Sequence, residues 1–333
     1  MEKVVIALDA MGGDYAPEQT VKGAVEAVNS SDEIRVILVG KQDMIAKELE
    51  KYEYAKEDIE VVHASEIIDM GDVPTVAIKD KKDSSLVVAM RLVREGKADA
   101  LVSAGSTGAV LVGGQLVVGR LKGIKRPPLA PFIPTTKGFS LLIDCGANVD
   151  ARPEHLVQFA QMGSIYYENV MGKKNPTVAL LNIGTEEEKG NQLVKETYPL
   201  LKECEGINFI GSVEAREIAS GGADILVCEA FVGNVILKFF EGVALTFLGC
   251  IKEGLMSSLR TKLGALMVKP ALKGLVKTFD VSSQGGAPLL GLKGLVVKAH
   301  GNSKAKEIKT ALCQCIAFKE NSINEKITDM IQK

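Results

Sequence analysis

The amino-acid sequence predicts an α/β fold, with a doubly wound, mostly parallel sheet and a helical insert. Short apolar runs alternate with amphipathic helical patterns along nearly the whole chain, as they do where helices connect parallel strands. The apolar runs are uninterrupted, as expected for strands that are covered on both faces. No linker, repeat or low-complexity tract divides residues 1–333, so we expect one large domain.

The predicted strands show this two-sided apolar pattern most clearly in the runs VILV (36–39) and VALL (178–181). The predicted strand ranges are 3–8, 34–39, 59–63, 98–103, 139–144, 177–182, 207–210, 223–228 and 294–299.

Amphipathic helices are predicted between these strands. Pro17 suits a first helical turn, and Thr185 with Glu188 forms a capping box ahead of a helix. The uncharged stretch 101–119 is as long as a membrane span, but its five glycines and several polar residues favour a buried strand, loop and helix. The clearest predicted helices are 17–29, 83–95, 153–169, 186–204 and 303–320.

The segment 233–280 breaks this alternation, because it contains helical pattern and no strand candidate. Its first half has an unusually apolar face, and between Cys250 and Phe279 six basic residues stand against one acidic residue, Glu253. Two interpretations stay open. The helices are buried in a subunit interface, or they form a basic amphipathic surface for an anionic membrane or an acidic carrier protein, and both can hold for different faces of one insert.

Composition excludes several classes of protein. A net charge of −2, with 46% hydrophobic and 25% charged residues, gives no reason to expect nucleic acid as a partner. The six cysteines form no CxxC pair and no zinc spacing, which is typical of thiols in a reducing compartment. The first ten residues read as a strand and not as a signal peptide, so a cytoplasmic protein is expected.

Glycine-rich loops follow most of the predicted strands, where an α/β sheet binds its ligands. Bare backbone amides and helix N-termini in such loops suit an anion, so a phosphate or a phosphorylated ligand is expected. The candidate binding residues are Asp9, Gly12, Gly13, Asp14, Gly105, Ser106, Thr107, Gly108, Asn148, Asn182, Gly184, Thr185, Gly233, Gly285 and Gly286. Lys189 adds a positive charge and Asn234 an amide donor.

Several familiar sites are missing from the sequence. No loop matches a P-loop, no GxGxxG follows the first strand, and no GxSxG elbow is present. Aspartates at loop starts (Asp9, Asp14, Asp144 and Asp150) have the right chemistry for Mg²⁺, but such residues more often bond backbone amides in turns. We therefore expect neither a metal nor a cofactor.

At these loops the sequence resembles the bacterial phosphate acyltransferase family, which makes acyl phosphate from acyl carrier protein thioesters early in phospholipid synthesis. The resemblance runs almost end to end. It rests on the segments DAMGGD (9–14), SAGSTGA (103–109), GRLKGIKRP (119–127), DCGANVDARPEHL (144–156), LLNIGTEEEKGN (180–191), FVGNVILKFFEG (231–242), GGAPLLGL (285–292) and KAHGNS (298–303). Ser106 stands where the family usually has asparagine.

The resemblance implies a homodimer, peripheral attachment to the membrane through 233–280, and a fold related to isopropylmalate dehydrogenase and phosphotransacetylase. It also implies acyl carrier protein and inorganic phosphate as substrates. A membrane acyltransferase that passes the acyl group from acyl phosphate to glycerol 3-phosphate is a further candidate partner. We expect Lys189 to hold the phosphate charge and Asn234 to donate to the thioester carbonyl or orient the nucleophile.

Two other functions are compatible with the sequence. The first is an oxidoreductase of the β-decarboxylating dehydrogenase type, which would share the fold and need a nicotinamide site. The second is a non-catalytic membrane scaffold that relies on the segment 233–280 alone.

Overall fold

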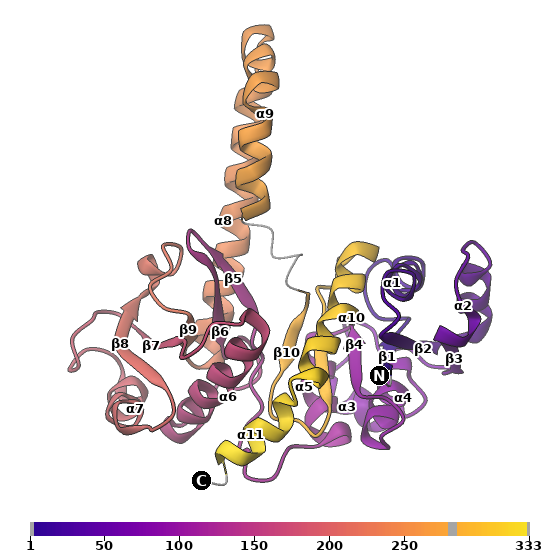
Figure 1. Ribbon diagram of the computed structural model, residues 1–333, viewed down its shortest axis with the longest axis horizontal. Helices are drawn as coiled ribbons and strands as arrows, with labels where there is room; N and C mark the ends of the chain where they lie inside the picture. Colours follow the sequence, from indigo (N-terminus) through magenta and orange to yellow (C-terminus); the bar gives the residue numbers. More distant parts are fainter. Residues whose placement is uncertain (1–2, 279–284, 332–333) are drawn as a thin grey trace.

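A computed structural model describes residues 3–278 and 285–331 (Figure 1). Within these residues the strands form two sheets, one of six strands and one of five. Most neighbouring strands are parallel, which confirms the predicted α/β class. The division into two sheets was not apparent from the sequence pattern, and the single-domain interpretation stays a prediction.

The six-stranded sheet has the order β10-β11-β4-β1-β2-β3. Its strands are β1 (Val4–Asp9), β2 (Ile34–Gly40), β3 (Ile59–His63), β4 (Ala100–Ser103), β10 (Ala287–Leu289) and β11 (Leu295–Lys298). The helices around it are α1 (Glu18–Val28), α2 (Gln42–Leu49), α3 (Pro74–Asp80), α4 (Ser85–Arg94), α5 (Thr107–Gly113) and α10 (Ala305–Glu320). The stretch 101–119 is a buried strand, loop and helix, as predicted.

The five-stranded sheet has the order β5-β6-β9-β7-β8. Its strands are β5 (Phe132–Thr135), β6 (Gly138–Ile143), β7 (Thr177–Asn182), β8 (Asn208–Glu214) and β9 (Ile225–Val227). The helices beside it are α6 (Pro153–Met171) and α7 (Gln192–Glu203), and α11 (Ile323–Ile331) packs on α6.

The two sheets are joined through backbone contacts beside β10. The amide of Ala130 donates to Pro288 O at 3.0 Å, and the amide of Leu290 donates to Pro128 O at 3.1 Å. One apolar cluster also contains buried side chains from both sheets and from α6 and α10, among them Leu8, Ile143, Phe159 and Leu312. These contacts pack the two sheets against each other.

Helix α7 begins six residues later than predicted. The side chain of Asn191 accepts a hydrogen bond from the amide of Val194 at 3.0 Å, so Asn191 is the cap and the Thr185–Glu188 capping box is wrong. Gly190 has a φ of +108°, which no right-handed helix contains, and it ends the loop immediately before this cap.

The insert is a helical hairpin of α8 (Ala230–Met256) and α9 (Leu259–Thr278), which projects away from both sheets (Figure 1). Its helical character was predicted, although the last two residues of the predicted range, 279 and 280, lie outside the described residues. The 27 residues of α8 span about 40 Å. By length and composition alone α8 is apolar enough to cross a membrane, and only 6% of its most apolar window is buried.

Candidate functional site

Three strands of the six-stranded sheet end side by side at the candidate site: β1 at Asp9, β4 at Ser103 and β11 at Lys298. The hydroxyl of Ser103 donates to Asp9 Oδ2 at 2.7 Å and accepts from the amide of Gly105 at 3.1 Å. The side chain of Asp9 is thereby fixed against the loop that follows β4.

The loop 9–14 folds tightly against the loops after β4 and β11. A Cβ on Gly12 would lie 2.4 Å from Asp9 Oδ2 and 2.8 Å from the amide nitrogen of Gly105, so only glycine fits there. The amide of Asp14 donates to Gly301 O at 2.8 Å. The segments DAMGGD, SAGSTGA and KAHGNS, which lie far apart in the sequence, therefore meet at one edge of the sheet.

Other predicted residues of these loops have local roles. Ser106 caps α5, where its hydroxyl accepts from the amide of Ala109 at 3.5 Å, and Thr107 is exposed. Gly108 lies against Pro74 of α3. The amide of Gly286 donates to Gln314 at 3.0 Å, and a Cβ on Gly286 would lie 2.7 Å from Lys298 O. Gly285 and Gly286 thus lie beside the end of β11.

Lys298 is a buried cation at this edge, with 8% of the residue exposed. Its ammonium donates to the carbonyls of Ala104 and Ala299, the former at 3.5 Å. Burial lowers the pKa of Lys298 to about 8, while the charge of Asp9 opposes the shift and the ammonium of Lys238 adds to it. Burial raises the pKa of Asp9, and hydrogen bonds from Ser85 and Ser103 oppose that change.

Lys298 was missed as a candidate in the sequence, although it begins the motif KAHGNS. The signal in the sequence was a lysine at the end of an uninterrupted apolar run, LVV, which the structure shows to be a buried strand. Lysine is almost never fully buried unless it is paired, so a buried lysine at this position indicates a functional role.

The loop after β6 carries the predicted residue Asn148, which is 6% exposed. Its amide donates to Asp144 Oδ2 at 2.7 Å and to Pro127 O at 3.0 Å, so both amide hydrogens are already engaged. Asp144 Oδ1 also accepts from the amide of Leu129 at 2.9 Å and from those of Gly146 and Ala147 at 3.2 Å. Asp144 and Asn148 therefore shape the loop.

Helix α8 begins directly on this loop. A Cβ on Gly233 would lie 1.9 Å from Asp144 O, so the helix is in backbone contact with the end of β6. The carboxylate of Glu229 caps the helix and accepts from the amides of Phe231 and Val232 at 2.6 and 2.9 Å. Sequence motifs after β6 and β9 are thus brought together.

Asn234 is exposed and shares one stripe of α8 with Lys238 and Glu241, at helical spacings of four and three residues. Lys238 pairs with Glu241 at 2.9 Å, and Glu241 lies 3.7 Å from His300 Nε2, just beyond β11. Through Glu241, the stripe that carries Asn234 therefore reaches the edge of the sheet with Lys298.

Lys238 lies within electrostatic reach of groups from both sheets. Burial raises the pKa of the Cys145 thiol at the end of β6, and nearby acidic groups raise it further, whereas Lys238 lowers it. The same ammonium lowers the pKa of Lys298, as described above. The start of α8 thus links the carboxyl edges of both sheets.

The loop after β7 contains Asn182, Gly184, Thr185 and Lys189. Asn182 donates to Lys189 O at 3.1 Å, and the Lys189 ammonium pairs with Glu186 at 2.7 Å. Hydrogen bonding to Glu186 raises the pKa of Lys189, whose side chain is 51% exposed. No contact among the described residues joins this loop to Asp9 or Lys298, so the structure does not bring Lys189 to the buried cation.

Among the described residues, no three acidic, histidine or cysteine side chains are grouped so that they could hold a metal ion. Asp9 and Asp144 are instead bonded to groups of the chain itself. The expected absence of a metal and of a cofactor stays a prediction.

The chain is similar to known proteins over nearly its whole length. Residues 4–326 match the family model described as fatty acid synthesis protein. The chain is 51% identical over 330 residues to a phosphate acyltransferase of Clostridium acetobutylicum, covering 99% of both chains. It is 54% identical over 324 residues to a phosphate acyltransferase of Alkaliphilus oremlandii, covering 97% of this chain and 96% of the relative.

Solved structures share the fold. A phosphotransacetylase from Streptococcus pyogenes superimposes with a TM-score of 0.64 at 17% identity, over 95% of this chain and 94% of the other. A 4-hydroxythreonine-4-phosphate dehydrogenase from Klebsiella pneumoniae gives a TM-score of 0.52 at 13% identity, over 95% and 99%. The relation in fold that the resemblance implied is confirmed. The family model and the full-length relatives both point to the family that the motifs at the strand ends resemble. The chain belongs to the phosphate acyltransferase family of fatty acid synthesis proteins.

Proposed function

We propose that this protein transfers an acyl group from acyl carrier protein to inorganic phosphate, forming acyl phosphate for phospholipid synthesis. The relatives named phosphate acyltransferase support the general reaction. The observation that carries the proposal is the buried ammonium of Lys298 among the glycine-rich loops after β1 and β4.

An ammonium with a pKa of about 8 remains mostly protonated at pH 7 and attracts the phosphate dianion. Burial strengthens this attraction, because the surrounding dielectric constant is lower than that of water. Lys298 therefore supplies the charge at the buried edge, and Lys189 remains a second candidate on the exposed loop after β7.

The reaction needs positioning more than acid–base chemistry. A phosphate oxygen forms a bond to the thioester carbonyl carbon, the carbon–sulfur bond breaks, and the thiolate leaves with the electron pair. Donors that stabilise the intermediate oxyanion are each worth about 10²–10³ in rate. Asn234 is the candidate donor, because its carboxamide is exposed on the stripe of α8 that reaches the edge with Lys298 through Glu241.

The α8–α9 hairpin supports two further parts of the proposal, a homodimer and peripheral attachment to the cytoplasmic face of the membrane. Large apolar side chains along it are exposed, including Phe239, Phe247, Leu259 and Met267. An apolar surface of this extent is normally covered by another protein or by lipid. Attachment would bring the product to a membrane acyltransferase that uses acyl phosphate.

The test is incubation of the pure protein with palmitoyl carrier protein and phosphate, followed by trapping of acyl phosphate with hydroxylamine. Palmitoyl hydroxamate should form only when phosphate is present. Its absence, with intact thioester remaining, would rule out the proposed reaction. A nicotinamide absorbance assay on the same preparation should give no signal.

A further inference from the structure

A cluster of basic side chains lies on the body of the protein, away from the hairpin. It comprises Arg120, Lys122, Lys125, Arg126, Arg152 and Lys293, all exposed, and we refer to it as the basic surface. We propose that the basic surface is the docking site of the acidic carrier protein that delivers the acyl group. The proposal rests on the proposed function and says where the acyl carrier protein binds.

Several contacts bring the separate segments of the basic surface together. The guanidinium of Arg120 donates to Lys125 O, and Arg120 forms an antiparallel bridge with Leu292, the neighbour of Lys293. The Lys293 side chain comes within 3.7 Å of a Cβ placed on Gly119. Residues 119–126 and 292–293 therefore lie against one another.

The first turn of α6 completes the cluster. Burial lowers the pKa of His155, Glu154 raises it, and the charges of Arg126, Lys125 and Arg152 lower it further. These three cations therefore lie within electrostatic reach of one imidazole. Among the described ion pairs, only Lys125 of the six basic residues has a partner, Glu154 at 3.5 Å.

This positive charge is local, because the whole chain has a net charge of −2. Unpaired cations on one face attract an acidic protein, speed its association and orient it. An open cavity of about 360 Å³ adjoins Lys125 between α6 and α7. Val157 and Leu200 contribute apolar surface to its lining. An apolar hollow beside charged groups is typical of the core and rim of a protein interface.

Two residues of the basic surface, Arg126 and Arg152, border the loop after β6. Arg126 precedes Pro127, whose carbonyl accepts from Asn148, and Arg152 follows Asn148 by four residues. The amide of Ala230, the first residue of α8, donates to Asn148 O at 3.1 Å. A carrier protein seated here can pass its flexible thioester arm to the start of α8 and the edge with Lys298.

The distal basic residues of the hairpin are less suitable for this partner. Lys252 lies 22 residues beyond Ala230 along α8, which corresponds to about 33 Å from the strand ends. Cations at that distance fit a membrane surface or a second copy of the chain. The basic surface is therefore the better place for a protein whose acyl group must reach the strand ends.

The experiment compares the variant Arg126→Glu/Arg152→Glu with the control Lys47→Glu/Lys56→Glu, which makes the same change in charge at exposed positions on the far side of the six-stranded sheet. Donors are palmitoyl carrier protein and a palmitoyl pantetheine thioester, which has the arm without the protein. The Arg126/Arg152 variant should raise the KM for palmitoyl carrier protein at least about tenfold and weaken binding of the unacylated carrier protein. Its KM for phosphate and its rate with the pantetheine thioester should not change.

The conservative variant Arg126→Lys/Arg152→Lys should keep the KM close to that of the unmodified protein. An unchanged KM for palmitoyl carrier protein in the glutamate variant would overturn the docking site, as would an equal loss with the pantetheine thioester. Loss of binding to anionic phospholipid vesicles with an unchanged KM would assign the basic surface to lipid instead. Failure of the unmodified protein to form acyl phosphate from either donor would refute the proposed function itself.

Discussion

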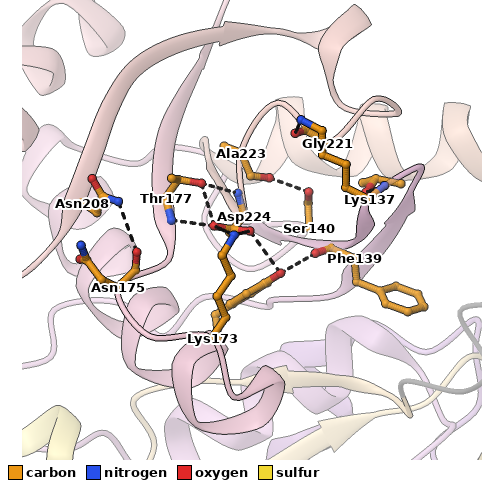
Figure 2. Close-up of polar contacts among 12 residues, drawn as sticks. Lys137, Phe139, Ser140, Lys173, Asn175, Thr177, Asn208, Gly221, Ala223 and Asp224 are labelled. Carbon is orange, nitrogen blue, oxygen red and sulfur yellow. Dashed lines mark hydrogen bonds and ion pairs between the residues drawn. The ribbon is translucent and has the colours of Figure 1, made fainter.

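The ammonium of Lys173 lies 2.6 and 2.7 Å from the two carboxylate oxygens of Asp224, at the amino end of the five-stranded sheet (Figure 2). Asp224 also accepts from the amide and the hydroxyl of Thr177, both at 2.8 Å. One carboxylate thus connects the residues that follow α6 with the first residues of β7 and β9. The candidate site lies at the opposite, carboxyl end of these strands, so stability and activity can be changed separately.

Replacement of Asp224 by alanine is predicted to lower the free energy of unfolding by about 1–3 kcal/mol, because the partly buried Thr177 amide loses its acceptor. Lys173→Ala should have a smaller effect, since its side chain is 55% exposed. Urea unfolding measures both values. Equal stability of Asp224→Ala and the unmodified protein would contradict the structural role of this carboxylate.

The same carboxylate contributes to acid sensitivity. Burial alone would raise the pKa of Asp224, but hydrogen bonds from Lys173 and Thr177 outweigh it and hold the pKa below its ordinary value of 3.8. The unfolded chain therefore binds the proton more readily, and the stabilisation is present above pH 3.8 and is lost as the pH falls through the lower folded pKa. Asp224→Asn should lose less unfolding free energy between pH 5 and pH 3 than the unmodified protein, as measured in urea.

Lys298→Met is predicted to reduce kcat/KM for phosphate by about 10²–10³, because the buried charge is removed from the site. Activity of the unmodified protein should decline as the pH rises through about 8, where Lys298 loses its proton. Lys298→Arg should keep its charge through this range and shift the decline upward.

Although Lys298→Met should lower activity, it should raise the free energy of unfolding, because burying an ammonium opposes folding. The lowered pKa of Lys298 leads to the same expectation. The folded state binds the proton less readily than the unfolded state, so the charged side chain lowers the free energy of unfolding. A melting temperature at or above that of the unmodified protein, with low activity, supports a functional lysine. Full activity of Lys298→Met would exclude it.

Lys189 in the loop after β7 and Asn234 on α8 can be tested separately from Lys298. From the sequence, Lys189→Ala and Asn234→Ala should each lower turnover at least about tenfold without changing the far-UV dichroism. Lys189 pairs with Glu186, so Glu186→Gln frees the ammonium and should not impair turnover. Near-normal rates in both alanine variants would remove these two residues from the mechanism and leave Lys298 as the candidate.

Gly12→Ala is predicted to lower both activity and stability, because the new methyl group would lie 2.4 Å from Asp9 Oδ2. Gly242→Ala is the matched control on α8, where a Cβ meets no atom within 4 Å among the described residues. A glycine replaced within an exposed helix should stabilise it by about 0.5–1 kcal/mol. Thermal unfolding and hydroxylamine trapping measure both effects.

The fold class and the convergence of glycine loops after β1 and β4 were predictable, since buried parallel strands have uninterrupted apolar runs. Strands β5 and β10 were not predicted, because they are only four and three residues long and contain Pro134 and Pro288. Their antiparallel pairing depends on contacts between distant segments, as does the division into two sheets.

Some site residues could likewise be predicted from local sequence, and others could not. Gly12 was predictable from local sequence, since tight turns and close approaches demand glycine. The burial of Lys298 depends on the pairing of β11 with β4, which lies almost 200 residues earlier in the chain. Local sequence does not predict that pairing. The amide group of Asn148 likewise donates to Pro127 O, an acceptor that lies beside it only in the folded chain.

Helix α8 is continuous from its contact with Asp144 to the tip of the hairpin, so a rigid tilt about its first turn would move the tip and Lys238 in the same direction. Lys238 is eight residues from the pivot at Ala230, about 12 Å along an axis of about 40 Å. A sideways displacement of the tip therefore reaches Lys238 reduced to roughly a third. Whatever holds the tip still therefore also steadies Lys238 and its partner Glu241, which contacts His300 beyond β11.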